Sequence, residues 1–122
     1  MDAPSFDHLL IAAPPGCEGQ ARRFFGGLLG LAEIPKPHAL RRRGGVWFAL
    51  GDHQLHIGVE QDFTPARKAH PAIRLDPRAI DGVAEALEQA GAVVEWDGTL
   101  SGERRLYTTD PWGNRIELVA AR

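Results

Sequence analysis

The chain has 122 residues, a length at which we expect one domain. Its 43% hydrophobic and 25% charged residues are typical of an ordinary globular protein. A net charge of −2, without a basic stripe interleaved with aromatic residues, argues against a nucleic-acid binder. No stretch approaches the roughly 18 apolar residues of a membrane span, and the N-terminal segment lacks a signal-peptide pattern. Cys17 is the only cysteine, so we expect no intrachain disulfide and a cytoplasmic location.

The first half of the chain predicts one helix among several strands. Residues 18–29 carry apolar side chains at helical spacing, and Gly30 follows as the expected residue after the helix. Pro35 opens a segment, 35–43, that we predict to be a loop. The predicted strands are 6–12, 31–34, 46–50 and 54–59, the last two forming a hairpin over Gly51 and Asp52.

The second half predicts the same order of elements. Residues 62–68 form the expected linker, and strand 70–75 opens the half. Asp76 is the predicted N-cap of a helix with Pro77 at its first position, and Gly91 follows the helix. The remaining predicted strands are 93–96, 105–109 and 114–120, and the turn Asp110-Pro111-Trp112-Gly113 leads into the last of them.

Equivalent residues recur at nearly one offset. Gly30 and Gly91 lie 61 residues apart, as do His56 and Glu117, and His8 and His70 lie 62 apart. Such an offset indicates a duplicated unit of about half the chain. We therefore predict an α+β fold, a single domain over 1–122, made of two βαβββ modules at about 1–61 and 69–122.

Alternation within the predicted strands separates an apolar face from a polar face. The positions expected to face the helices are all apolar: Leu55, Ile57, Val59, Ile73, Leu75, Ile116 and Leu118. The opposite face carries His56, His70 and Glu117, and the repeat assigns His8 to it as well. A curved sheet would bring these four side chains together inside a cup.

Three imidazoles and one carboxylate form a nitrogen–oxygen ligand set. A carboxylate in the middle of a short strand, such as Glu117, must be paired or must coordinate a metal if it is buried. We therefore predict that His8, His56, His70 and Glu117 bind a divalent ion of Zn, Ni, Fe, Co or Mn. The alternative is a metal-free polar pocket.

Four motifs together resemble the vicinal oxygen chelate superfamily. They are Phe6-Asp7-His8, Leu28-Leu29-Gly30-Leu31, Ala69-His70 and Asp110-Pro111-Trp112-Gly113-Asn114-Arg115-Ile116-Glu117. That group includes glyoxalase I, extradiol dioxygenases, fosfomycin-resistance transferases, methylmalonyl-CoA epimerase and bleomycin-resistance proteins. The resemblance covers nearly the whole chain. It implies an eight-stranded cup-shaped sheet with helices outside, and a homodimer.

The resemblance also implies that metal ligands come from the first and last strand of each half. These are the positions of His8, His56, His70 and Glu117. His56 departs from the family pattern, because glyoxalase I usually has Glu there, the epimerase Gln, and the dioxygenases and fosfomycin transferases take no ligand from it. His8, His70 and Glu117 are the firmer set, and His56 is either a fourth ligand or the catalytic base.

Four further residues are candidates for binding substrate. Arg74 and Arg115 share the face of the ligands and could hold an anionic group, although pairing with a neighbouring acid is the alternative. Trp47 and Tyr107 are candidates for the apolar wall of a pocket, with core packing as the alternative. The arginines at 41–43 and 104–105 are interpreted mainly as solvated loop charge.

The leading hypothesis is a metal-dependent lyase or isomerase of the glyoxalase type, acting on a small substrate with adjacent oxygens. The metal would act as a Lewis acid that stabilises an enediolate-like oxyanion. An extradiol-type dioxygenase or a thiol transferase, using His8, His70 and Glu117 alone, is the second hypothesis. A metal-free binding protein, like the bleomycin-resistance proteins, is the third.

Overall fold

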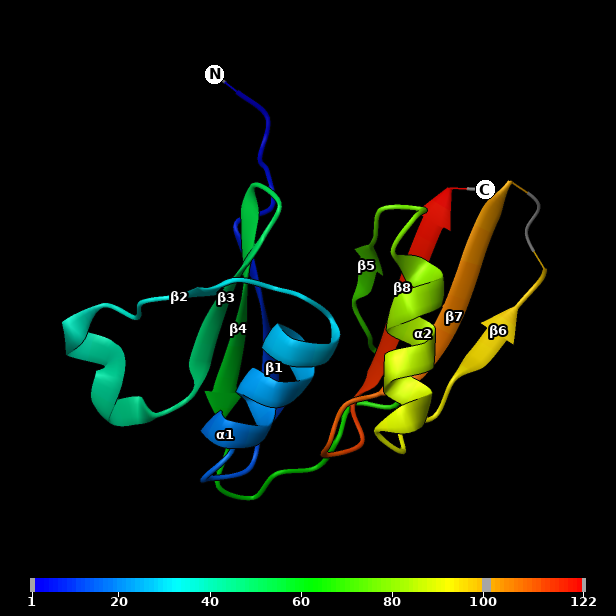
Figure 1. The fold of residues 1–122 in the computed structure, drawn as a ribbon. Coiled ribbons are helices and arrows are strands. Elements are labelled where there is room, and N and C mark those ends of the chain that lie inside the picture. Colours follow the sequence, from blue (N-terminus) through cyan, green and yellow to red (C-terminus); the bar gives the residue numbers. More distant parts are fainter. Residues whose placement is uncertain (1, 100–101, 122) are drawn as a thin grey trace. The chain divides into compact units, whose positions relative to one another are not determined.

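The computed structural model describes residues 2–99 and 102–121, which divide between Phe63 and Thr64 into two compact units. Each unit contains a four-stranded sheet with a helix against one face (Figure 1). The elements, in chain order, are β1 (His8–Ala13), α1 (Glu18–Ala21), η1 (Arg22–Leu28), β2 (Glu33–Ile34), η2 (His38–Arg43), β3 (Val46–Leu50), β4 (His53–Val59), β5 (Ala72–Arg74), α2 (Ile80–Gln89), β6 (Glu95–Asp97), β7 (Glu103–Thr109) and β8 (Arg115–Ala121). The predicted α+β class with two βαβββ modules is confirmed. None of the helices in the described ranges has the length and apolar character that crossing a bilayer requires.

The sheet of the first unit has the strand order β1-β4-β3-β2. β1 runs parallel to β4, and the other neighbours are antiparallel. The face toward the helix is apolar as predicted, with Leu55 and Ile57 of β4 opposite Phe48 and Val46 of β3. Burying a side chain the size of Phe48 stabilises the fold by roughly 1.5–3 kcal/mol. The opposite face carries polar and aromatic residues, together with the exposed Leu10 of β1.

The sheet of the second unit has the order β5-β8-β7-β6, again with one parallel pair. α2 packs against the face that carries Ile116 and Leu118 of β8, both fully buried. On β7, Leu106 lies opposite Leu118, and Tyr107 lies opposite Glu117 on the other face. The pattern of alternation therefore identifies both faces of this sheet.

The first predicted helix is not α-helical throughout. α1 covers Glu18–Ala21, and η1, Arg22–Leu28, is a π-helix in which the N–H of Leu29 donates to the carbonyl of Phe24 at 3.0 Å. Gly26 and Gly27 lower the α-helical propensity of this segment. A Cβ added at Gly26 would lie 3.6 Å from Phe48, which is ordinary van der Waals contact, so the helix packs on β3 at this glycine.

Three local predictions were wrong. Residues 35–43 are not all loop, because η2 is a 3-10 helix over His38–Arg43. The N-cap of α2 is Ala79, and Asp76 instead accepts a hydrogen bond from the N–H of Arg78 in the preceding turn. β5 begins at Ala72, so His70 lies on the segment that leads into the strand rather than on the strand itself.

Candidate functional site

His70 and Glu117 meet on the polar face of the second sheet. Glu117 lies in β8, where its N–H donates to the carbonyl of Pro71 at 3.0 Å and so ties the strand to the segment that carries His70. Oε1 of Glu117 lies 3.0 Å from Nε2 of His70. Only 4% of Glu117 is exposed, so its carboxylate is held where water screens it poorly.

The other ring nitrogen of His70 decides how this contact is made. Nδ1 of His70 lies 2.8 Å from the carbonyl oxygen of Lys68. Because a carbonyl oxygen only accepts, Nδ1 donates, so Nε2 donates to the carboxylate when the ring is protonated and directs a lone pair at it when the ring is neutral. Two acceptors at this distance need a proton or another cation to stabilise the contact.

Arg105 completes the surroundings of Glu117. Its guanidinium donates to Oε2 of Glu117 and lies 3.6 Å from Oε1 of Glu103. Arg105 was predicted to be a solvated loop charge, which was wrong, since it lies inside β7 on the face of Glu117. The missed signal was alternation, because Arg105 and Tyr107 lie two positions apart on one strand.

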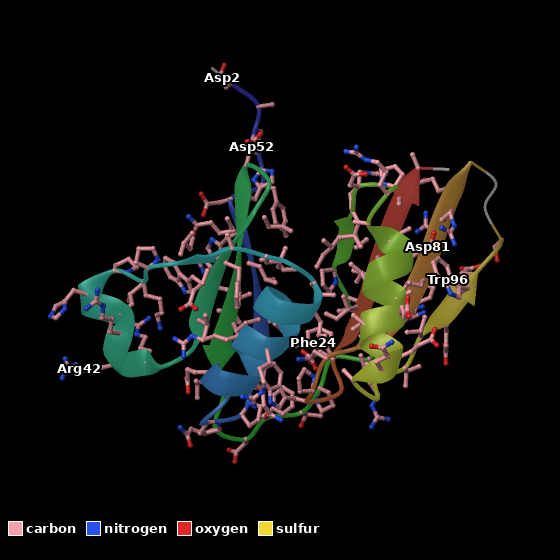
Figure 2. The ribbon with its side chains drawn as sticks, viewed as in Figure 1. Asp2, Phe24, Arg42, Asp52, Asp81 and Trp96 are labelled. Carbon is pink, nitrogen blue, oxygen red and sulfur yellow. The ribbon has the colours of Figure 1, made fainter. Side chains whose placement is uncertain are left out.

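Arg104 lies on the opposite face of β7 from Arg105. It donates to Asp81 of α2 at 2.8 Å, and its guanidinium carbon lies 4.6 Å from the ring centre of Trp96. Figure 2 labels Asp81 on α2 and Trp96 on β6. This arginine fastens the helix to the sheet edge and has no part in the polar face.

The first unit brings His8, His56 and Trp47 into one stack of rings. The centroids of His8 and His56 are 4.2 Å apart with an interplanar angle of 20°. The centroids of His56 and Trp47 are 3.7 Å apart with an angle of 1°. The stack crosses β1, β4 and β3, so His8 lies on the polar face and Trp47 packs there rather than in the core.

Each histidine of this stack also has a polar neighbour. Nδ1 of His8 lies 2.8 Å from Oδ2 of Asp7, and Nε2 of His56 lies 2.8 Å from Oε1 of Gln54. Burial, followed by the charge of His8, lowers the pKa of His56 below its usual value. A neutral His56 imidazole has the protonation state that a metal ligand or a general base requires.

The candidate substrate residues differ in what surrounds them. Arg115 places its guanidinium carbon 4.1 Å from the ring centre of Tyr107, and the ring centres of Tyr107 and His70 are 5.8 Å apart at an interplanar angle of 74°. Arg74 instead makes an exposed ion pair with Glu103 at 3.3 Å. Tyr107 therefore connects Arg115 with His70, while Arg74 has an acidic neighbour of its own.

The remaining reactive side chains lie elsewhere. His38 is exposed on η2, where Arg42 projects away from the strands of its unit (Figure 2). His53 contacts Phe6 edge to face at 5.7 Å. Cys17 is buried at the start of α1, and burial raises the pKa of its thiol, which makes it a poor nucleophile.

The four predicted ligands thus form two pairs, His8 with His56 in the first unit and His70 with Glu117 in the second. Among residues 2–99 and 102–121, no three His, Cys, Asp or Glu side chains are grouped closely enough to hold one ion. The Glu117 pair nevertheless fits a cation, because Nε2 of a neutral His70 ring and a carboxylate oxygen are both metal-ligand atoms and lie 3.0 Å apart. The ligating His70 would also have its other N–H on a backbone carbonyl, as metal-bound histidines usually do.

Comparison with solved structures finds a relative that matches over the full length with high sequence identity. A Bacillus anthracis protein assigned to the glyoxalase family is 43% identical, with a TM-score of 0.90, covering 100% of this chain and 98% of that chain. Neither a protein-family model nor any curated protein sequence matches this chain.

Two more distant structures share the fold. A lactoylglutathione lyase from Agrobacterium tumefaciens is 17% identical with a TM-score of 0.72, covering 98% of this chain and 96% of that chain. A variant of the fosfomycin resistance protein FosX from Listeria monocytogenes, in complex with Mn(II) and 1S,2S-dihydroxypropylphosphonic acid, is 16% identical. Its TM-score is 0.78, with 99% of this chain and 95% of that chain covered.

Proposed function

Because this chain belongs to the glyoxalase family of the vicinal oxygen chelate superfamily, we propose that it is a metal-dependent enzyme acting on a small molecule with two adjacent oxygens. The reaction would be of the lyase or isomerase type. Family membership alone does not assign a reaction, since one fold hosts many activities. The proposal therefore depends on the chemistry of the side chains.

The contact between His70 and Glu117 carries the proposal. Nε2 of His70 and Oε1 of Glu117 are 3.0 Å apart, and Nδ1 of His70 is already committed to the carbonyl of Lys68. When the His70 ring is neutral, a divalent cation would be held between these two atoms, while Arg105 keeps its contact with the other oxygen of this almost fully buried carboxylate.

We propose that the ion is Zn, Ni, Fe, Co or Mn, held by His8, His70 and Glu117, with His56 as fourth ligand or base. The FosX complex with Mn(II) shows that this fold can hold such an ion in another protein. When bound, the ion would supply Lewis acidity toward adjacent substrate oxygens.

The chain's own residues would divide the remaining work. Asp7 would orient His8, and the carbonyl of Lys68 would orient His70. Arg105 would hold the carboxylate of Glu117 in place. His56, neutral because its pKa is lowered, would accept a proton from a substrate C–H if it is not a ligand.

Metal content per chain tests the proposal, on protein purified without a histidine tag. We expect near-stoichiometric divalent metal in the wild type, and loss of metal and turnover in Glu117→Gln. Glu103→Gln is the matched control, because Glu103 also pairs with Arg105 on the same face. A Glu117→Gln variant that keeps metal and turnover would contradict the assignment.

One observation favours a three-ligand site as second candidate. His56 has Nε2 bonded to Gln54 and ring stacking on both faces, so it is restrained before any ion binds. A site of His8, His70 and Glu117 alone would suit an extradiol-type dioxygenase or a thiol transferase. The dioxygenase would be supported if the bound element is iron, if His56→Gln has the same iron content as the wild type, and if the protein takes up oxygen with a catechol.

The third function, a metal-free binding protein, predicts a different result. A ligand that binds the native state must raise its stability. No metal on isolation, and a melting curve unaffected by divalent ions or chelator, would therefore favour that function.

A homodimer and a cytoplasmic location also stay predictions. Equilibrium sedimentation tests the dimer.

A further inference from the structure

A cavity of about 360 Å³ opens on the polar face of the second sheet. Its lining includes Arg67, Glu95, Tyr107, Thr109 and Arg115. Two guanidinium groups against one carboxylate leave the cavity with net positive charge. Tyr107, one of its walls, also contacts the ring of His70, so the cavity adjoins the proposed metal ligands.

Hydrogen bonds to Ala66 place Arg67 beside Arg115. The N–H of Ala66 donates to Oδ1 of Asn114 at 2.8 Å, and the carbonyl of Ala66 accepts from the N–H of Arg115 at 2.9 Å. The segment before β5 is therefore fastened to the start of β8. Arg67 lies within the predicted linker 62–68, and only this pairing brings it to the cavity.

Arg115 is the cation on this face whose guanidinium is best positioned to bind a ligand. Its guanidinium lies over the ring of Tyr107, which restrains it while leaving the N–H groups at its edge for hydrogen bonds. The other arginines on this face, Arg74 and Arg105, are engaged by Glu103 and Glu117. Within the described residues, neither Arg115 nor Arg67 makes a side-chain ion pair with a carboxylate.

The cavity and the His70–Glu117 pair are within reach of one small molecule. The guanidinium carbon of Arg115 is 4.1 Å from the centre of the Tyr107 ring, which is 5.8 Å from the centre of the His70 ring. The guanidinium carbon of Arg115 therefore lies no farther from the centre of the His70 ring than the sum of these two distances. A substrate of a few carbon atoms could contact both.

We propose that the substrate carries an oxyanion, a carboxylate or a phosphate-type group, that Arg115 and Arg67 bind in this cavity. The inference rests on the proposed function, because it assigns the anionic end of the same substrate. Arg115 would fork onto two oxygens of the anion, and Arg67 would add a second positive charge. Glu95 would disfavour a ligand with negative charge at both ends.

NMR titration of the metal-free full chain tests the subsite with inorganic phosphate and, separately, with acetate at constant ionic strength. We expect saturable amide shifts at Arg67, Thr109 and Arg115. Arg115→Gln and Arg67→Gln should each weaken binding about tenfold or more, since one charged hydrogen bond is worth that much. Arg115→Lys, which keeps charge but loses the planar fork, should bind with intermediate affinity.

Arg78→Gln is the control for net charge, because Arg78 pairs with Asp76 in an exposed turn outside the cavity. It should bind both probes as the wild type does. No saturable shift in the cavity with either probe, or equal weakening in Arg78→Gln and Arg115→Gln, would overturn the inference. Tighter binding of phosphate than acetate would indicate a tetrahedral anion, and the reverse a carboxylate.

The anion subsite and the proposed metal-dependent function can be rejected separately. Metal on the wild type without anion binding would reject the subsite and keep the metal-dependent enzyme. Anion binding without metal uptake would keep the subsite and favour the metal-free binding protein.

Discussion

Nε2 of His70 lies 3.0 Å from Oε1 of Glu117, while Nδ1 of the same ring is bonded to the carbonyl of Lys68. The backbone thus determines which nitrogen faces the carboxylate. When the ring is neutral, two acceptors face each other at a buried carboxylate, and a proton or a metal cation stabilises the contact.

Divalent metal should therefore raise the melting temperature of the wild type. At free metal about 100 times the dissociation constant, the native state gains about 2.7 kcal/mol. Differential scanning fluorimetry with metal and with chelator measures the change. Glu117→Gln should lose the metal-dependent rise and Glu103→Gln should keep it; a full rise in Glu117→Gln would contradict the role of that carboxylate.

Gly45→Ala should destabilise the first unit. Gly45 has φ +90, and a Cβ there would lie 2.1 Å from the carbonyl oxygen of Ile57. Strain and overlap together should lower the free energy of unfolding by at least about 2 kcal/mol. Urea denaturation measures it.

Gly51→Ala is the control for that substitution. Gly51 also has positive φ, +58, but a Cβ added there would have no other atom within 4 Å. It should cost only the backbone strain, about 1 kcal/mol. An equal loss of unfolding free energy in both variants would mean that the overlap with the Ile57 carbonyl oxygen does not contribute to the destabilisation.

Glu18 should make stability depend on acid pH. Oε2 of Glu18 accepts from the N–H of Gly45 at 2.6 Å, and this hydrogen bond lowers the pKa of Glu18 from its usual 4.5. Because the pKa of Glu18 is lower in the folded than in the unfolded protein, its contribution to the free energy of unfolding is fully present above the unfolded pKa. The contribution is lost as pH falls through the folded pKa. The stability advantage of wild type over Glu18→Gln should therefore shrink on acidification.

Urea denaturation of both proteins from about pH 7 to about pH 3 measures this advantage, because the loss occurs below the unfolded pKa. Glu88→Gln, a substitution at an exposed position of α2, controls for the loss of one negative charge. An advantage that is constant or grows toward acid would contradict the proposed effect of the Gly45 N–H.

Asn114→Ala should weaken both the second unit and its anion subsite. Asn114 accepts from the N–H of Ala66 and donates to Oδ2 of Asp110, each at 2.8 Å, and the side chain is buried. Leaving these groups without partners should cost about 2 kcal/mol of unfolding free energy. Arg67 should then be less well held, and phosphate binding weaker.

Urea denaturation and the phosphate titration measure the two effects. Gln89→Ala truncates an exposed amide on α2 and should change neither stability nor binding appreciably. Destabilisation of Asn114→Ala with unchanged phosphate affinity would show that Arg67 needs no support from Ala66.

Local sequence patterns were sufficient for most of the strands and both main helical segments, and for the two faces of each sheet, but not for η2 or for the π-helical form of η1. Alternation assigned Leu55 and Ile57 to the helix side, and His56 and Glu117 to the other, because a strand has a strict period of two. The turn at Asp110 was likewise predictable, and its side chain accepts from the N–H groups of Trp112 and Asn114. The repeat of about 61 residues predicted two modules.

Tertiary structure decided which side chains meet across segments. The pairing of Arg105 with Glu117 depends on the β7–β8 register, which places residues twelve apart in the chain on one face. Arg67 reaches the cavity only because Ala66 is bonded to Asn114 and Arg115. The sequence by itself therefore determined the family, the folding pattern and the residue types of the polar face. Contacts between distant segments are set by packing and register, which no local spacing encodes, and these decided which arginines are engaged and which face the cavity.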